Sequence, residues 1–246
     1  MKPVKIYEDE CVDLLTKNQY KIIQKKKGFR FSLDSVLLAN FCRLQEGDKI
    51  IDLGTGSAII PLIIITYLKN CHITGVEILR DISLMAQRSI ELNNLEPHIS
   101  IINDDLKKIK DRFPVHSFNV VISNPPYHPV GEGNINPDRT QAIARHEIAC
   151  TLEDLVKTAY YLLKDDGRFF IVYKPQRIFE LFSQLEHYRF HISRIRFVHP
   201  NVNERAKFVL VECLKKGKKI PEIMKPLIIY EKEGIYSQEL KEIYFS

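Results

Sequence analysis

The stretch 49–57 constrains the fold most, because it places a short β-branched run directly before two glycines, Gly54 and Gly56. An apolar segment, 58–68, follows them, so this order predicts a strand, a tight turn and a buried helix. Glycines at such a turn allow positive φ and let a ligand approach the backbone closely. Strands and helices alternate from residue 49 onward, which predicts an α/β fold with a parallel, doubly wound sheet.

The hydrophobic period and the turn residues predict the remaining elements. Thr151 and Asp154 are spaced as an N-terminal cap of a helix. Helices are expected at 32–41, 58–68, 80–93, 152–163 and 175–187, and further strands at 72–76, 99–102, 118–122 and 168–172.

The two ends of the chain differ from this alternating pattern. Segments 191–198 and 206–214 are expected to close the sheet as a final antiparallel strand pair. Residues 1–31 are expected to form an N-terminal basic arm with a short β-pair at 20–31. Residues 32–246 are long enough for a single domain with a large buried core.

Composition excludes several classes of protein. Of 246 residues, 45% are hydrophobic and 27% charged, which is ordinary for a soluble globular chain. No tract reaches the ~18 to 20 apolar residues that span a bilayer, and the N-terminus lacks an apolar signal core. The five widely spaced cysteines form no C-x-x-C pair, which argues against a disulfide framework or a zinc site. We therefore expect a cytoplasmic protein without a metal.

A carboxylate follows the strand after the glycine turn. Glu77 can accept hydrogen bonds from both ribose hydroxyls of a nucleoside-containing cofactor. The alternative is a surface charge at a strand end. The turn itself departs from the dinucleotide fingerprint, because Ile59 stands in the place of its third glycine.

A further acidic pair closes the strand 99–102. Asp105 is the candidate for contacting the adenine amino group of the cofactor, with Asp104 as the alternative. A plain N-cap of the next short helix is the rival interpretation.

The run 118–122 ends in Ser123 and then in Asn124, Pro125, Pro126 and Tyr127. Two prolines remove two backbone donors and stiffen the turn, leaving carbonyl acceptors between an amide and an aromatic ring. Such a turn suits a planar substrate that carries an NH₂ group. The glycine turn, both carboxylate positions and this turn end four predicted strands, and the carboxyl ends of parallel strands line one crevice.

Positive charge gathers outside the predicted sheet. The net charge is only +5, so its distribution carries more information than its size. Within an N-terminal cluster, the part 25–30 is favoured for RNA contact, whereas the run 215–219 is expected to be a solvated surface. The N-terminal cluster comprises Lys17, Lys21, Lys25, Lys26, Lys27 and Arg30.

The segment 128–147 lacks periodicity and contains several glycines, asparagines and prolines. A loop of this length is typical of a functional lid or of disorder. Arg139, Arg145 and His146 are candidates for gripping RNA; a structural role, pairing with Glu147 or capping the helix 152–163, is the alternative for Arg145 and His146.

At this point the chain resembles class I S-adenosylmethionine-dependent methyltransferases that modify amino groups. Within them it is most similar to the bacterial tRNA1(Val) adenine-37 N6-methyltransferase family. The resemblance covers residues 28 to 213 and implies a Rossmann-like sheet in a methyltransferase domain at 32–246. It is carried by the segments 28–38, 52–56, 124–127, 144–147 and 196–200.

The resemblance implies a role for each candidate residue. The cofactor is S-adenosylmethionine, and the target is the N6 amino group of an adenosine in tRNA. Catalysis is assigned to Asn124, Pro125, Pro126 and Tyr127. Cofactor binding is assigned to Asp52, Gly54, Thr55, Gly56, Glu77, Asp105 and Asn124. RNA binding is assigned to Lys25, Lys26, Lys27, Arg30, Arg145 and His146.

Other functions share parts of this pattern. A protein glutamine methyltransferase uses the same turn on a side-chain amide, and DNA or rRNA amino-methyltransferases use it on other bases. A non-catalytic RNA-binding module is the rival of a different class. The expected partner is tRNA, with no membrane or metal, and the expected state is a monomer.

Overall fold

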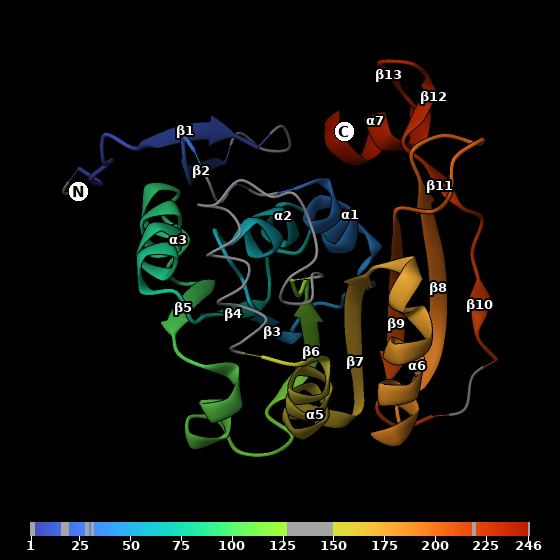
Figure 1. The fold of residues 1–246 in the computed structure, drawn as a ribbon. Coiled ribbons are helices and arrows are strands. Elements are labelled where there is room, and N and C mark those ends of the chain that lie inside the picture. Colours follow the sequence, from blue (N-terminus) through green and yellow to red (C-terminus); the bar gives the residue numbers. More distant parts are fainter. Residues whose placement is uncertain are drawn as a thin grey trace.

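The computed structural model describes residues 3–15, 20–27, 30, 32–126, 150–217 and 220–245. A central sheet runs through it, with helices packed on both faces (Figure 1). The strands of this sheet are β3 (Lys49–Leu53), β4 (His72–Glu77), β5 (Ile99–Asn103), β6 (Phe118–Ser123), β7 (Leu163–Tyr173), β8 (His191–His199), β9 (Phe208–Leu214), β10 (Glu222–Ile223) and β11 (Leu227–Ile228).

The strand order across the sheet is β10-β8-β9-β7-β6-β3-β4-β5, and β11 also pairs with β8. Strands β3 to β7 pair in parallel, whereas β9 lies antiparallel between β7 and β8. This confirms the mostly parallel Rossmann-like sheet with a final antiparallel pair.

Helices cover the two faces because successive strand residues point to opposite sides. Ile50 and Val120 face one core, to which Leu240 near the C-terminus also belongs, and Ile51 and Val121 face the second core on the other side. Each fully buried aliphatic side chain contributes roughly 1.5–3 kcal/mol. The first face carries α1 (Leu33–Phe41), α2 (Ile59–Tyr67) and α3 (Arg80–Leu92); the second carries α5 (Leu152–Leu162), α6 (Ile178–His187) and the 3₁₀ helix η1 (Leu106–Asp111).

The sequence predicts most of these boundaries closely. Thr151 accepts from the backbone N–H of Asp154 at 3.1 Å, and the Asp154 carboxylate caps in return, so the predicted cap of α5 is confirmed. Strand β7 begins at Leu163 rather than at residue 168, since Leu163 already pairs with Phe118 before a register shift.

The N-terminal β-pair differs from the one predicted at 20–31. Strand β1 (Glu10–Leu14) pairs antiparallel with β2 (Lys21–Lys25), so the first strand lies well before residue 20. The pair packs on α3, as Figure 1 shows at the N-terminal side of the molecule. Several hydrogen bonds fix it there. Ile23 N–H donates to Ser89 Oγ at 2.9 Å, and the buried Glu10 carboxylate accepts two hydrogen bonds of 2.7 Å from Arg88.

The C-terminal part contains elements that the sequence did not predict. After β11 come β12 (Tyr230–Lys232), β13 (Ile235–Tyr236) and α7 (Gln238–Phe245). Strands of two or three residues are too short to show a period of two. Within the described ranges, none of the helices is both long and apolar enough to cross a membrane.

The Arg88–Glu10 pair generates a prediction about the N-terminal hairpin. Hydrogen bonding from Arg88 lowers the pKa of Glu10 to about 2, so both groups are charged at neutral pH. We expect Arg88→Leu to remove both Arg88 hydrogen bonds from the buried Glu10 carboxylate, which keeps only the Tyr7 N–H and the Lys25 ammonium beside it, and so to loosen β1 and β2 from α3. Hydrogen exchange should then speed up in residues 10–14 and 21–25 more than in β3. Arg80→Leu, an exposed change on the same helix, is the matched control; unchanged protection in the Arg88 variant would contradict this docking role.

Candidate active site

Four strand ends meet at one edge of the sheet. In the parallel register, Asp52 of β3 lies opposite Gly75 of β4 and Ile122 of β6, and Glu77 lies opposite Asn103 of β5. At this edge β3 leads into the glycine turn, β5 into the Asp104–Asp105 pair, and β6 into the Asn124 turn. The predicted convergence of these segments is confirmed.

The glycine turn is held by its neighbouring strand. Gly54 and Thr55 both donate their backbone N–H to the Val76 carbonyl at 2.9 Å. Gly54 adopts φ +80°, and a Cβ added there meets nothing within 4 Å. The space beside Gly54 is therefore empty, and a ligand can come close to its backbone. A side chain at this position would fill that space.

Glu77 is the residue that fixes the far end of this turn. One carboxylate oxygen accepts from the Gly56 N–H at 3.0 Å and the other from the Leu79 N–H at 2.8 Å. The residue is buried, with 2% of its surface exposed. It is therefore part of the turn, and the alternative of a strand-end surface charge is wrong.

Polar atoms without partners lie beneath the turn. Neither carboxylate oxygen of Asp52 has a hydrogen-bond partner among the described residues, and the same holds for the hydroxyls of Thr55 and Ser57. Burial raises the pKa of Asp52 to about 7; the nearby Thr55 hydroxyl opposes this shift and the Glu77 carboxylate adds to it. Unsatisfied buried groups are costly, so their gathering at one turn marks a place built for a polar ligand.

The two acidic residues after β5 make different contacts. The Asp105 side chain accepts from the Lys107 N–H at 2.9 Å and caps η1, which confirms the N-cap interpretation. Asp104 pairs with Arg112, and this hydrogen bond lowers its pKa. Both residues line the cavity described below, so the cap does not remove Asp105 from the site.

The Asn124 turn is anchored to two distant segments. Ser123 Oγ donates to the Leu53 carbonyl at 2.7 Å, which ties the end of β6 to the glycine strand. The Asn124 amide donates from Nδ2 to Ser35 Oγ on α1 at 2.8 Å. This contact orients the amide so that its oxygen is directed away from Ser35. The sequence did not predict the role of Ser35, although the residue lies in the segment 28–38.

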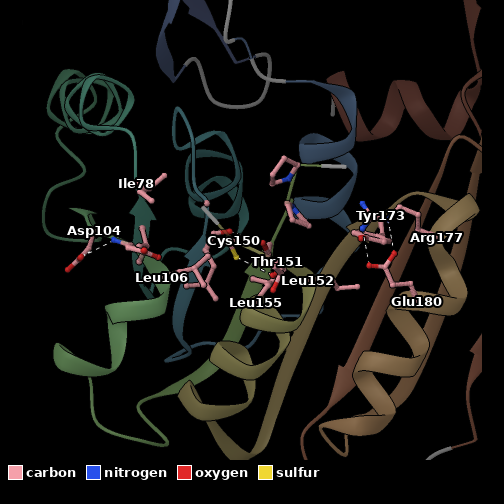
Figure 2. A pocket seen from close by; sticks show the side chains of 17 residues that line it. Ile78, Asp104, Leu106, Cys150, Thr151, Leu152, Leu155, Tyr173, Arg177 and Glu180 are labelled. Carbon is pink, nitrogen blue, oxygen red and sulfur yellow. Dashed lines mark hydrogen bonds and ion pairs between the residues drawn. The ribbon is translucent and has the colours of Figure 1, made fainter. Parts of the chain in front are cut away.

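A cavity of about 330 Å³ opens between the acidic pair and the turn. In Figure 2, Asp104 and Leu106 lie on one side of it, and Tyr173, Arg177 and Glu180 lie on the other. Its size is within the range of small-molecule sites. It is lined by Leu53, Gly54, Val76, Ile78, Asp104, Asp105, Leu106, Ser123, Pro125, Pro126, Cys150, Thr151, Leu152, Leu155, Tyr173, Arg177 and Glu180.

The wall formed by Tyr173 and Arg177 was missed from the sequence. Arg177 forms two hydrogen bonds with Glu180, of 2.7 and 2.9 Å, and lies 5.4 Å from the Tyr173 ring centre. Tyr173 is the last residue of β7, and Arg177 follows four positions later. Applying the strand-end rule to this fifth strand would have found them.

Four basic residues that are predicted to bind RNA lie in the described N-terminal part of the chain. Lys25 lies 2.6 Å from Asp9, Lys26 donates to the Glu8 carbonyl at 2.8 Å, and Arg30 lies 2.6 Å from Asp13. The exposed Lys27 follows in the same segment. Tyr127, Arg139, Arg145 and His146 lie outside the described residues.

A parallel sheet with a glycine turn after its first strand, a carboxylate after its second and a cavity over its carboxyl edge defines a class I methyltransferase architecture. The family model "Methyltransferase small domain" matches residues 31–188, so the chain belongs to that family.

The chain is also similar to individual methyltransferases. The chain is 25% identical to the tRNA1(Val) (adenine(37)-N6)-methyltransferase of Pedobacter heparinus over 91% of its own length and 92% of the relative's. It is 26% identical to the protein of the same name from Trichodesmium erythraeum, over 90% and 91%. Among solved structures, a predicted O-methyltransferase from Agrobacterium tumefaciens shares the fold with a TM-score of 0.70, at 22% identity and with 86% and 95% of the two chains covered.

The cofactor of this family is S-adenosylmethionine, and the residues present fit it. The open backbone at Gly54, the buried polar atoms that lack partners among the described residues, and the Asp104 and Asp105 carboxylates beside the cavity suit a nucleoside with a cationic amino-acid arm. In the described part of the chain, no group of three His, Cys, Asp or Glu side chains is placed to hold a metal ion.

The raised pKa of Asp52 predicts a stability cost of this site. The folded state retains the proton up to about pH 7, whereas the ordinary value is 3.8, so stability falls as pH rises between these values and stays low above. The shift corresponds to a cost on the order of 4 kcal/mol. We expect Asp52→Asn to raise the melting temperature of the cofactor-free protein at pH 8 but hardly at pH 4, and to weaken cofactor binding. The exposed Asp111→Asn is the control; a gain that does not depend on pH would contradict the buried charge.

Proposed function

We propose that this chain transfers a methyl group from S-adenosylmethionine to the N6 amino group of an adenosine in tRNA, at position 37 as in the relatives' names. The observation that carries the proposal is the Asn124 turn, clamped between Ser35 and the glycine strand at the rim of the cavity. The two relatives that match over nine-tenths of the chain support the choice of substrate.

In this proposal each site residue has a task. Gly54, Thr55 and Gly56 pass beneath the cofactor, and Asp52 receives its amino group or orients the turn. Glu77 accepts hydrogen bonds from its ribose hydroxyls, as in the family that the chain resembles. Asp105 contacts its adenine, while its cap on η1 holds the carboxylate in place.

The turn prepares the substrate. The lone pair of an aromatic amine is delocalised into the ring, so the amine is a poor nucleophile. The Asn124 side-chain oxygen and the Pro125 carbonyl accept its two hydrogens and favour a pyramidal nitrogen. S-adenosylmethionine supplies an electrophilic methyl group on a cationic sulfur. Positioning and fixed dipoles carry most of the catalysis, and the product proton leaves to water without a strong general base.

The target adenosine has to leave its stack to reach this turn. Tyr127 stacks on it in the proposal, which is worth roughly 1–3 kcal/mol per base. Arg145, His146 and the cluster from Lys25 to Arg30 contact the RNA around it. We further propose that the chain acts as a monomer in the cytoplasm, with tRNA as its partner.

Incubation of the purified chain with labelled S-adenosylmethionine and either total RNA, DNA or protein tests this function, with nucleoside and amino-acid analysis of the products. We expect N6-methyladenosine in the tRNA fraction. Label in glutamine or in DNA would instead support the alternative methyltransferases, and absence of label with intact cofactor binding would support a non-catalytic module.

The Asn124→Ala variant tests the turn itself. It should lose methyl transfer by at least a hundredfold while cofactor binding stays near normal, because the amide acts on the substrate. Asn70→Ala, at the opposite edge of the sheet, is the matched control. Near-normal turnover of Asn124→Ala would rule out the proposed role.

Ser35 tests how the amide is oriented. Ser35→Ala removes the acceptor of the Asn124 Nδ2 hydrogen bond, and a lost hydrogen bond of this kind is worth about 1–3 kcal/mol. We expect kcat to fall about tenfold or more with little change in the KM for the cofactor. Ser35→Thr, which keeps the hydroxyl, should recover most of the rate; equal rates in Ser35→Ala and the wild type would show that the contact is dispensable.

A further inference from the structure

The ends of β3, β4 and β5 form the acidic side of the carboxyl edge, because they carry Asp52, Glu77 and the Asp104–Asp105 pair. β5 is the last strand on this side of the sheet, and the chain continues from it through the acidic pair into η1. Asp104, Asp105 and Leu106 all line the cavity. The position of this segment therefore sets the shape and the charge of the cavity on its acidic side.

Asp104 and Arg112 stand on either side of η1 and bond to each other across it. Arg112 donates from Nε to Oδ2 of Asp104, and Oδ1 of the same carboxylate accepts from the Asp105 N–H at 2.9 Å. The Arg112 hydrogen bond lowers the pKa of Asp104, and the Asp105 N–H adds to this shift, so the carboxylate is charged at neutral pH. Both oxygens of Asp104 thus hold the segment that follows it.

Asp105 lies inside the segment that this pair closes. Its Oδ1 accepts from the Lys107 N–H at 2.9 Å, whereas its Oδ2 comes no nearer than 3.8 Å to the Lys107 ammonium, which is beyond hydrogen-bond distance. Ile109, 1% exposed, anchors the same segment in the second core. A cofactor amino group can approach Asp105 without displacing a hydrogen bond at Oδ2, but at Asp104 it would compete with Arg112.

We propose that Asp104 is a positioning residue: Arg112 holds it so that Asp105 and Leu106 are set for the adenosine part of S-adenosylmethionine before the cofactor binds. This rests on the proposed contact of Asp105 with the cofactor adenine, and it is independent of the choice of tRNA as substrate. Ordering a binding segment in advance removes an entropic cost from the binding step.

The exposure of the pair determines which effect to expect. The Arg112 side chain is 51% exposed and that of Asp104 is 21% exposed. Ion pairs in such positions contribute little to the stability of a whole protein. Loss of the pair should therefore leave the chain folded and change the order of the segment and the affinity for the cofactor.

Two measurements on the cofactor-free chain test the proposal without an RNA substrate. By calorimetry with S-adenosylmethionine and with S-adenosylhomocysteine, we expect Arg112→Gln to bind about two- to tenfold more weakly, as for one side chain that has to be ordered on binding. Hydrogen exchange should speed up in residues 105–109 of this variant but not in β4. Arg112→Lys should recover most of the affinity, and Lys110→Gln, which removes an exposed charge of η1, should match the wild type.

A double-mutant cycle separates positioning from direct contact. Asp104→Asn keeps an acceptor for the Asp105 N–H and removes the charge with which Arg112 pairs. If the two residues act only through each other, the double variant Asp104→Asn/Arg112→Gln should bind no more weakly than the weaker single variant. Additive losses would show that Asp104 contacts the cofactor itself and would overturn the proposal.

The remaining outcomes distinguish this pair from the contact on which it depends. Unchanged affinity in Arg112→Gln, with or without faster exchange, would reject the role of the pair in cofactor binding. Asp105→Ser keeps a side chain that can cap η1 and removes the carboxylate, so it should also bind the cofactor more weakly. Unchanged affinity in Asp105→Ser would remove Asp105 from the cofactor site, and the positioning role of Asp104 with it.

Discussion

The parallel pairing of β3 with β4 on one side and β6 on the other is the constraint on which the site depends. It sets Asp52 opposite Gly75 and Ile122, so the glycine turn, Glu77 and the Asn124 turn leave the sheet at one edge. Hydrogen bonds across this edge then fix the details: Glu77 holds Gly56, and Ser123 holds the Leu53 carbonyl. Among the described residues the buried Asp52 carboxylate has no hydrogen-bond partner, so this arrangement costs stability.

Much of this arrangement could be predicted from the sequence because it follows from local rules. A β-branched run before two glycines defines strand and turn, and the carboxyl-end rule places Glu77, Asp105 and Asn124 together. Asp105 caps η1, as the rival interpretation expects, and also lines the cavity, while its contact with the cofactor adenine stays a prediction.

Contacts between distant segments could not be predicted. The Ser35–Asn124 hydrogen bond joins residues 89 positions apart, and no local pattern encodes it. The N-terminal lysines look like a free basic cluster in the sequence, yet Asp9 and Asp13 lie beside Lys25 and Arg30 once β1 pairs with β2. Conversely, Lys174 and Lys207 are single lysines in the sequence and lie over the same Phe208 ring only because β7 and β9 are neighbours.

In the proposed reaction, this edge of the sheet brings a methyl donor on its acidic side to an adenosine in tRNA at the Asn124 turn. The most direct measurement is mass-spectrometric mapping of tRNA1(Val) from cells that lack A37 N6-methylation and express either the intact chain or a chain without the Asn124 amide. We expect N6-methyladenosine at position 37 with the intact chain alone. An unmodified position 37 in the presence of the folded, cofactor-binding intact chain would rule out this reaction.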